Sequence, residues 1–235
     1  MVIFLGFFYQ NMFYDNLTVN IPTFRRLPQL DLCFAFSDRG SMFVFSSDHF
    51  KQLLSIDNTW TADSLLDLGA GDGKITQKMA SHFQHVFATE ISGQMQKHLR
   101  HQGFTVVGID EWTDRKYDMI SCLNLLDRCD KPVTLLKQIR DSLTPDGKLI
   151  VASVSPYSPF VEENRSNGNK PSEVMDIQHC TSIEDQINQT VNNIFIPNGF
   201  SLVSFSRLPY LCEGDLTNSF YILHDIIFIL KPLVT

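Results

Sequence analysis

The sequence predicts an α/β protein with a mostly parallel, doubly wound sheet, helices on both of its faces, and an antiparallel pair of strands at the end. Three observations support this prediction. Apolar runs alternate with helical segments after residue 60, a glycine-rich turn follows the first run, and only a loop separates the last two runs. Strands that alternate with helices indicate parallel βαβ units, whereas strands joined by a short loop pair antiparallel.

Seven segments have the composition of buried strands. The first is the run SLLDLG, which ends in glycine, and the next four read HVFATE, TVVGID, YDMISCLN and KLIVASVS. The last two, FSLVSFSRL and FYILHDIIFILK, form the expected antiparallel hairpin. In order, the seven segments span 64–69, 85–90, 105–110, 117–124, 148–155, 200–208 and 220–231.

Four segments predict helices, at 74–83, 92–102, 131–148 and 182–195. Ser92 is a residue type that caps helix N-termini. Pro132 lies near the start of the third helix, which a Pro-Asp-Gly sequence ends, and Asp130 is interpreted as its cap. Residues 156–180 are rich in Pro, Asn, Ser and Glu, and they predict a long surface excursion.

Length and charge limit the domain organisation and the partners. The 235 residues predict an N-terminal extension, residues 1–45, partly packed on a single domain that spans 46–235, and a monomer. The net charge of -7, without a long basic run, argues against nucleic acid as a partner. No apolar run approaches the ~20 residues that span a bilayer, so no transmembrane span is expected.

The cysteines predict neither a disulfide framework nor a metal site. They are five in number and scattered, and none forms a CxxC pair. Cys122 and Cys129 are seven positions apart, which is not the spacing of zinc ligands. We therefore interpret them as packing residues and expect no bound metal.

The turn DLGAGDG at 67–73 is the first candidate for ligand binding. Ligands of open α/β sheets bind beyond the carboxyl ends of the strands, where Gly69 and Gly71 allow a close approach. Asp67 suits an ammonium group better than a pyrophosphate, and Glu90 follows the next strand, where a carboxylate can accept both ribose hydroxyls. The spacing is G-x-G-x-G, so a dinucleotide site and a turn that binds nothing remain alternatives.

DLGAGDG, with an acidic residue closing the next strand, is similar to the nucleotide-binding motif of class I S-adenosylmethionine-dependent methyltransferases. The resemblance implies a Rossmann-like fold and S-adenosyl-L-methionine as the cofactor, with S-adenosyl-L-homocysteine as the product. It implies Asp67, Gly69 and Gly71 around the aminoacid part of the cofactor and Glu90 on its ribose. It also implies adenine contacts from Asp110 and Glu111, at the end of the third strand.

A narrower resemblance covers about residues 40–235. The stretches CLNLLDRCD and RLPYLCEGD, together with KPSEV and LLDLGAGDGKIT, resemble the DREV-type methyltransferase-like family. The resemblance implies a protein-histidine methyltransferase that modifies the pros nitrogen of histidine in His-x-His sequences, where x is small. Its partners would be proteins that contain this motif. Relatives suggest the endoplasmic reticulum, other endomembranes or the mitochondrion, and the cytoplasm is the alternative.

The stretch CLNLLDRCD, residues 122–130, supplies two candidate catalytic residues. Asn124 offers a donor and an acceptor that could orient an imidazole ring or the peptide backbone. Asp127 could accept the other ring N–H, which fixes the tautomer, and stabilise the charge that develops on the ring. The alternative for both residues is an Asx-type cap on the following turn.

Tyr210 and Tyr221 complete the predicted acceptor site, since the resemblance implies that they contact the target histidine or its peptide. Either tyrosine could instead be a core ring with its hydroxyl at the rim. Two other functions remain open at this point. One is a methyltransferase that acts on a small metabolite or a quinone, and the other is a catalytically silent scaffold.

Overall fold

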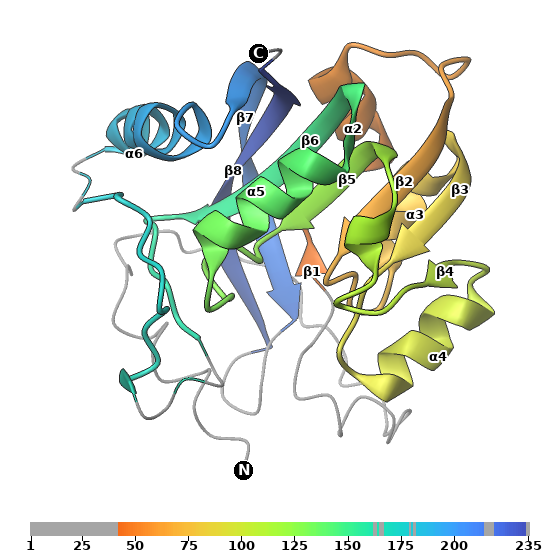
Figure 1. Cartoon of the computed structure of the whole chain (residues 1–235), viewed down its shortest axis with the longest axis horizontal. Coiled ribbons are helices and arrows are strands. Elements are labelled where there is room, and N and C mark those ends of the chain that lie inside the picture. The colour runs from red at the N-terminus through yellow and green to blue at the C-terminus, as the bar shows by residue number, and fades with distance from the viewer. Residues whose placement is uncertain are drawn as a thin grey trace.

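The computed structural model describes residues 42–161, 164, 167–178, 180, 182–213 and 219–233, with the backbone alone at 42, 212 and 213. Within these residues, one eight-stranded sheet forms the centre of the molecule (Figure 1). The strands are β1 (Met42–Phe43), β2 (Ala62–Leu68), β3 (Phe83–Ala88), β4 (Thr105–Val106), β5 (Tyr117–Leu123), β6 (Leu143–Ser155), β7 (Phe200–Glu213) and β8 (Phe220–Pro232).

The predicted fold class is confirmed. Strands β2 to β8 correspond to the seven predicted segments, and β1 adds a two-residue strand at one edge. The order in the sheet is β1-β7-β8-β6-β5-β2-β3-β4. Pairing is parallel from β4 through β3, β2 and β5 to β6, whereas β8 runs antiparallel to both β6 and β7. The chain thus reverses its direction of winding between β2 and β5.

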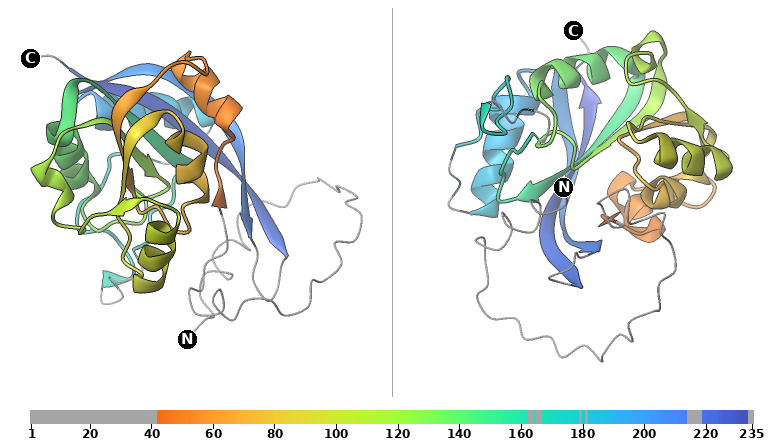
Figure 2. Two further views of the ribbon diagram at one scale, coloured as in Figure 1. Left: turned by 90° about the vertical axis from the view of Figure 1, so that its right-hand side faces the viewer. Right: turned by 90° about the horizontal axis from the view of Figure 1, so that it is seen from below.

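Helices cover both faces of the sheet. They are α2 (Ser47–Leu54), α3 (Lys74–Ala80), α4 (Gly93–His101), α5 (Pro132–Ser142) and α6 (Ile183–Gln189), with the 3-10 turn η2 (Trp112–Asp114) and the π-helical turn η4 (Thr190–Phe195). One core cluster joins α5, α6 and η4 to the sheet through Leu136, Ile187 and Phe195. A second cluster, with Phe50 and Met79, joins α2 and α3 to the opposite face. Figure 2 shows these layers from two sides.

The N-terminal part that the structure describes packs on this second cluster. Val44 and Phe45 are buried beside Phe50, and their two rings stack with centroids 6.1 Å apart. Helix α2 was not predicted from the sequence. It begins at a Ser46 N-cap, whose hydroxyl accepts the His49 N–H.

Helix boundaries differ from the predictions in three respects. Helix α5 ends at Ser142 rather than at the Pro-Asp-Gly sequence, because β6 follows it directly and contains that sequence. Helix α3 ends at Ala80 rather than at residue 83, because Phe83 is buried as the first residue of β3. The prediction that Asp130 caps α5 is wrong, since the N-cap is Lys131. The Asp130 carboxylate instead accepts hydrogen bonds from the Ser172 N–H at 2.8 Å and the Ser172 hydroxyl at 2.5 Å.

The cap of α5 comes from the predicted surface excursion. The Glu173 carboxylate accepts the Thr134 N–H, in the first turn of the helix, at 2.8 Å. A carboxylate near a helix N-terminus satisfies a free backbone donor and complements the helix dipole. Asp130 and Glu173 therefore fasten the excursion to the start of α5.

The β7–β8 hairpin extends past the end of β6. Ser155, the last residue of β6, pairs with His224, so residues 220–223 of β8 lie beyond the end of β6 (Figure 2). This end of the hairpin carries exposed apolar side chains, among them Leu211 and Ile222. The hairpin thus forms a wall beyond the carboxyl end of β6.

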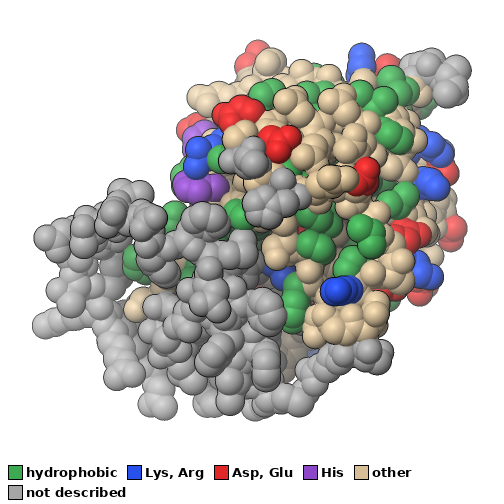
Figure 3. Space-filling model, turned by 90° about the vertical axis from the view of Figure 1, so that its left-hand side faces the viewer, with side chains coloured by type: hydrophobic (Ala, Val, Ile, Leu, Met, Phe, Trp, Pro, Cys, Tyr) green, Lys and Arg blue, Asp and Glu red, His purple; other side chains and the backbone are tan. Residues whose placement is uncertain are grey.

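The described surface carries charges of both signs. On the face drawn in Figure 3, Lys and Arg side chains are interspersed with Asp and Glu side chains. None of the helices in the described part of the chain is long and apolar enough to cross a membrane.

Candidate active site

The glycine turn leaves β2 with its backbone bound to the end of β3. Gly69 and Gly71 have positive φ angles of 67° and 57°. The Gly69 N–H donates to the Thr89 hydroxyl at 3.0 Å, and the Gly71 N–H donates to Glu90 Oε2 at 3.0 Å. A Cβ atom at Gly71 would meet no heavy atom within 4 Å, so the main chain is open to a ligand at this position.

Gly73 has a different role from Gly71. A Cβ atom at Gly73 would lie 2.4 Å from Gln102 Oε1 and 2.7 Å from Leu99 Cδ2. Its φ of 75° also belongs to the left-handed region. Gly73 is therefore required by the packing of α4 against the start of α3, whereas Gly71 leaves room for a ligand.

Glu90 is held by two backbone amides. Its Oε2 accepts the Gly71 N–H, and its Oε1 accepts the Ser92 N–H at 2.8 Å. The side chain is only partly buried, and each oxygen has a further lone pair for a ligand hydroxyl. The turn after β2 and the carboxylate after β3 therefore have the geometry and the donor set to hold a nucleoside. The predicted role of Glu90 on a ribose fits this arrangement.

Asp67 faces the interior of the protein. It is 3% exposed, and its two oxygens accept the Thr76 hydroxyl at 2.5 Å and the Ser121 hydroxyl at 2.6 Å. Burial raises the pKa of Asp67 to about 6, and the two hydroxyl hydrogen bonds oppose this rise. Asp67 ties β2 to α3 and β5, and its contact with the aminoacid part of a cofactor stays a prediction.

Asp110 and Glu111 do not end a strand as predicted. Strand β4 stops at Val106, and both acidic residues follow it in an exposed turn in which the Glu111 N–H donates to the Gly108 carbonyl. Only Val107 continues the strand's hydrogen bonding, through its N–H to the Ala88 carbonyl. The adenine contacts of Asp110 and Glu111 stay a prediction.

The loop after β5 lies directly beside the glycine turn. The sheet reverses its winding between β2 and β5, and ligands of open α/β sheets bind at such switch points. Leu125 Cδ1 lies 3.4 Å from the position of a Cβ atom at Gly69. The structure thus places the loop that carries Asn124 and Asp127 beside the turn that can hold a nucleoside.

Asn124 is oriented by a partner far away in the sequence. Its backbone is left-handed, with φ 50°, and its N–H donates to the Ala152 carbonyl. The side-chain amide donates from Nδ2 to Asp225 Oδ2 at 2.7 Å. Asp225 lies on β8 and is fully buried. Asn124 is therefore bound to the C-terminal hairpin, which argues against a local Asx cap.

Asp127 is buried next to a cation. It is 4% exposed, and its Oδ2 lies 3.2 Å from Arg128 Nε. Burial raises the pKa of Asp127, and the Arg128 guanidinium partly opposes this rise. The nearby Tyr157 hydroxyl is buried and, among the described residues, has no hydrogen-bond partner. Burial, and next the Asp127 charge, raise its pKa.

Tyr210 and Tyr221 lie on neighbouring strands of the hairpin. Tyr210 is 3% exposed and belongs to the second core cluster, while Tyr221 is half-buried. Tyr210 pairs with Leu223 across the hairpin, so both tyrosines lie on the face of the sheet that also carries Asp225. Tyr221 is four residues from Asp225, roughly 13 Å along the strand, so it could contact only a large acceptor that also reaches Asn124.

Asp225 and Tyr157 are the candidate residues that sequence reasoning missed. Asp225 had a signal, since it is the single charged residue at the start of the buried run DIIFIL. Tyr157 had none, because it lies in a stretch rich in Pro and Ser. The interpretation of the cysteines as packing residues is supported for Cys122, which is fully buried, whereas Cys129 and Cys180 are only partly buried.

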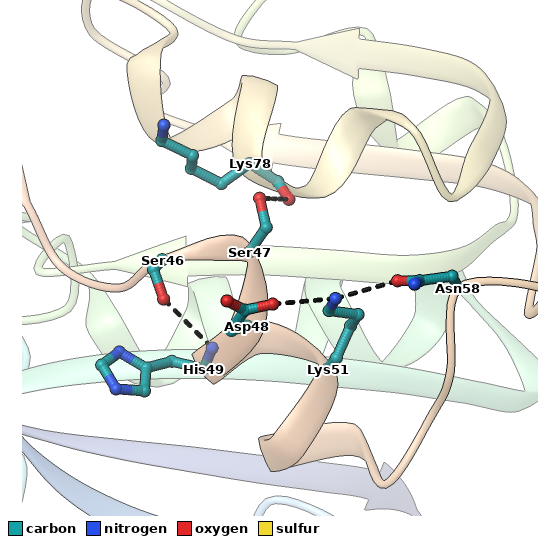
Figure 4. A network of polar contacts seen from close by, with 7 residues as sticks. All are labelled: Ser46, Ser47, Asp48, His49, Lys51, Asn58 and Lys78. Carbon is teal, nitrogen blue, oxygen red and sulfur yellow. Dashed lines mark hydrogen bonds and ion pairs between the residues drawn. The ribbon is translucent and has the colours of Figure 1, made fainter.

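A shallow hollow near the start of β2 is lined by α2 and the loop that joins α2 to β2, including Asp48, Lys51 and Asn58. Lys51 Nζ bridges Asp48 and Asn58, at 2.8 Å from an oxygen of each (Figure 4). This hollow lies at the start of β2, away from the carboxyl edge, and we assign it no ligand. Among the described residues, no group of three or more His, Cys, Asp or Glu side chains could hold a metal ion.

Comparisons with known proteins agree with this geometry. The model of the DREV methyltransferase family matches residues 7–232. A ubiquinone biosynthesis O-methyltransferase from Aeromonas salmonicida (strain A449) is 24% identical over 102 residues, which cover 39% of this chain and 43% of that relative. The chain thus matches less than half the length of this curated relative.

Solved methyltransferase structures share the fold at low sequence identity. The N-methyltransferase NodS from Bradyrhizobium japonicum WM9, in complex with S-adenosyl-L-homocysteine, has a TM-score of 0.50 and 14% identity, covering 79% of this chain and 84% of its own. A putative RNA methyltransferase from Pyrococcus horikoshii has a TM-score of 0.53 and 11% identity, covering 80% of this chain and 82% of its own.

The glycopeptide N-methyltransferase MtfA, complexed with S-adenosylmethionine, has a TM-score of 0.51 and 13% identity, covering 81% of this chain and 88% of its own. These likenesses concern the fold, whereas the family match spans nearly the whole chain. The protein belongs to the DREV methyltransferase family.

Proposed function

We propose that the protein is an S-adenosylmethionine-dependent methyltransferase that modifies the pros nitrogen of histidine in His-x-His sequences of other proteins. The family match supports the methyltransferase activity. The observation that carries the proposal is the contact between the two loops at the switch point. Leu125, between Asn124 and Asp127, lies against Gly69 of the turn that is open at Gly71.

The cofactor is S-adenosylmethionine, and the residues around the glycine turn can hold it. The open main chain at Gly71 and the partly buried carboxylate of Glu90 can take the ribose and the adjoining groups. Bound there, the cofactor supplies an electrophilic methyl group to a nucleophile brought from the acceptor side. The chain's own task is then to position that nucleophile, because methyl transfer is an in-line displacement.

A histidine acceptor needs orientation more than it needs a base. Imidazole has a pKa near 6.5, so it is mostly neutral and nucleophilic at neutral pH. The Asp127 carboxylate can accept the N–H of the ring nitrogen that is not methylated, which selects the tautomer. It also stabilises the positive charge that the ring gains, and Asn124 orients the ring or the peptide backbone.

The hairpin beyond β6 favours an extended acceptor. Tyr221 is roughly 13 Å along β8 from Asp225, a separation that about four extended residues of a peptide would cover. The exposed apolar side chains of this hairpin, Leu211 and Ile222 among them, could contact such a peptide. A small acceptor would leave this end of the hairpin without a role.

A peptide-library methylation assay tests the proposal. We expect the wild-type protein to methylate His-Ala-His peptides and to ignore peptides in which the second histidine is alanine. Asn124→Ala and Asp127→Ala should lose activity while still binding S-adenosyl-L-homocysteine. Cofactor binding without any methyl gain on the peptides, measured by mass spectrometry, would refute the protein-histidine assignment.

A small-molecule acceptor is the second candidate. The curated relative is by its name an O-methyltransferase of ubiquinone biosynthesis, and this observation alone favours it. The same assay with a hydroxylated quinone precursor distinguishes the two, because an O-methyltransferase would modify the quinone and leave the peptides unmodified.

A further inference from the structure

Asp225 and Asn124 share one hydrogen bond and are each left with one unpartnered oxygen. The Asn124 amide donates from Nδ2 to Asp225 Oδ2 at 2.7 Å. Asn124 Oδ1 and Asp225 Oδ1 are both buried, and neither has a hydrogen-bond partner within the described residues. Two such oxygens on the same pair of groups require an explanation, because a buried acceptor that is left unpaired destabilises the folded protein.

A single proton would satisfy both oxygens. An amide and a carboxylic acid are planar groups of similar size, and they can join through two parallel hydrogen bonds. In that arrangement the amide N–H donates to one carboxyl oxygen, and the carboxyl O–H donates to the amide oxygen. A carboxylate has no hydrogen to give, so it would leave Asn124 Oδ1 unpaired in the interior.

The surroundings of Asp225 also favour the neutral acid. Its cross-strand neighbours, Val154 on β6 and Leu208 on β7, carry no charge. The adjacent His224, and Arg207 on β7, project to the opposite face of the sheet, because Arg207 pairs with Ile226.

The charge that acts on Asp225 is the Asp127 carboxylate, which disfavours a second negative charge. Burial first, and Asp127 in addition, raise the pKa of Asp225 to about 7, while the Asn124 amide opposes this rise. Asp225 and Asp127 are thus two neighbouring carboxyl groups, of which Asp127 has a guanidinium beside it and Asp225 has an amide.

We propose that Asp225 is a positioning residue that acts as a neutral carboxylic acid, joined to Asn124 by two hydrogen bonds. The pair fixes the plane of the Asn124 amide against β8. It leaves the second Nδ2 hydrogen as the group that Asn124 can offer to the acceptor. The neutral pair rests on the Nδ2–Oδ2 hydrogen bond and on the two unpartnered oxygens, and its role toward a histidine rests on the proposed function.

The test compares two substitutions of Asp225. In Asp225→Asn, the new amide can donate to Asn124 Oδ1 and accept from Nδ2, so it reproduces the neutral pair. In Asp225→Ala, the Asn124 side chain loses its partner. We expect Asp225→Ala to lower kcat/KM for the peptide about 10- to 100-fold without changing the affinity for S-adenosyl-L-homocysteine, and Asp225→Asn to restore most of this loss.

Asp127→Asn is the matched control, since the same change is made on the neighbouring carboxyl group. We expect it to lose activity, because an amide cannot replace the charge that stabilises a methylated ring. If Asp225→Asn is as damaging as Asp225→Ala, the proposal is overturned, because a carboxylate would then be required at this position.

A titration of the wild-type protein tests the pair without any substrate. The carboxyl carbon resonance of Asp225 can be followed by NMR and assigned by its absence in Asp225→Asn. We expect the carboxyl to be protonated at about pH 5.5, where an ordinary aspartate is ionised. An ionised Asp225 at that pH overturns the proposal, even if Asp225→Ala fails to fold. Failure of peptide methylation would refute the proposed function and would leave this readout intact.

Discussion

The glycine-turn half of the site and the acceptor half are held in place by contacts of different range. Glu90 is fixed by the backbone amides of Gly71 and Ser92, both within 19 positions of it. Asn124 is fixed by Asp225, which is 101 positions away. The first half is therefore encoded within one βαβ unit, whereas the second exists only when the C-terminal hairpin has joined the sheet.

Two buried aspartates show the same contrast. Asp67 supports the glycine turn and Asp225 supports Asn124, and burial raises the pKa of each, to about 6 and about 7. Both oxygens of Asp67 accept hydroxyl hydrogens, and these hydroxyls can serve an ionised carboxylate. Asp225 has one amide donor and an unpaired oxygen. Similar burial thus leads to different chemistry, because the partners differ in what they can donate.

The largest expected effect concerns the stability that Asp67 contributes. Its folded pKa of about 6 lies above the unfolded value of 3.8, so its stabilising contribution is complete below about pH 4 and is lost as the pH rises through 6. Asp67→Asn, which stays neutral, should therefore gain up to about 3 kcal/mol relative to wild type between those pH values. Urea unfolding of both proteins at several pH values measures this difference.

Asp225→Asn provides the comparison for that series. Its stability relative to wild type should change over a window that ends near pH 7 rather than near pH 6. Identical pH windows for the two variants would contradict the distinction between the aspartates.

The next effect separates the two halves directly. Asn124→Ala should lower kcat/KM for the peptide about 100-fold, which corresponds to about 2.7 kcal/mol. Its affinity for S-adenosyl-L-homocysteine, measured by calorimetry, should stay within about threefold of wild type, because Asn124 makes no hydrogen bond to the glycine turn in the structure's described contacts. An equal loss in both measurements would show that the halves are not independent.

Glu90→Ala should have the reverse pattern. Removing a carboxylate that orients ribose hydroxyls should weaken S-adenosyl-L-homocysteine binding about tenfold. The His-x-His peptide should still be methylated when the cofactor is saturating. Asp72→Ala, in the same turn but two positions before α3, serves as a control, and a comparable loss of affinity there would argue that charge near the turn, rather than Glu90 itself, matters.

The smallest effect comes from a matched pair of glycines. Gly71 and Gly103 both have positive φ, and a Cβ atom at either would meet nothing within 4 Å. Alanine should therefore cost about 1 kcal/mol of folding stability at each position. Only Gly71→Ala should also weaken cofactor binding, by a few-fold. Equal cofactor affinity in both variants would mean that the open main chain at Gly71 does not contact the ligand.

Local patterns predicted the sheet and the glycine turn well. The seven strands carry apolar runs whose period and length depend on near neighbours, and Ser92 caps α4 as its type suggests. Predictions failed where a distant residue competes for a side chain. Asp130 has the sequence context of a helix cap, but Ser172 binds its carboxylate and Glu173 supplies the cap instead.

The acceptor half could be predicted only in part. The family resemblance named Asn124 and Asp127, and the structure places the loop that carries them beside the glycine turn through Leu125, while their roles stay a prediction. Asp225 could not be linked to Asn124 from local pattern, because the pairing depends on the register of β8 against β6. Asp110 and Glu111 were placed at a strand end because TVVGID reads as a strand, yet only its first two residues pair with β3.

The identity of the methylated atom tests the central claim most directly. The wild-type protein should be incubated with S-adenosylmethionine and a His-Ala-His peptide, and the product should be examined by mass spectrometry and NMR. We predict one methyl group on the pros nitrogen of a histidine ring, formed about 100-fold more slowly by Asn124→Ala at the same cofactor occupancy. A methyl group on the tele nitrogen, or no transfer to the peptide while the cofactor is bound, would contradict this account.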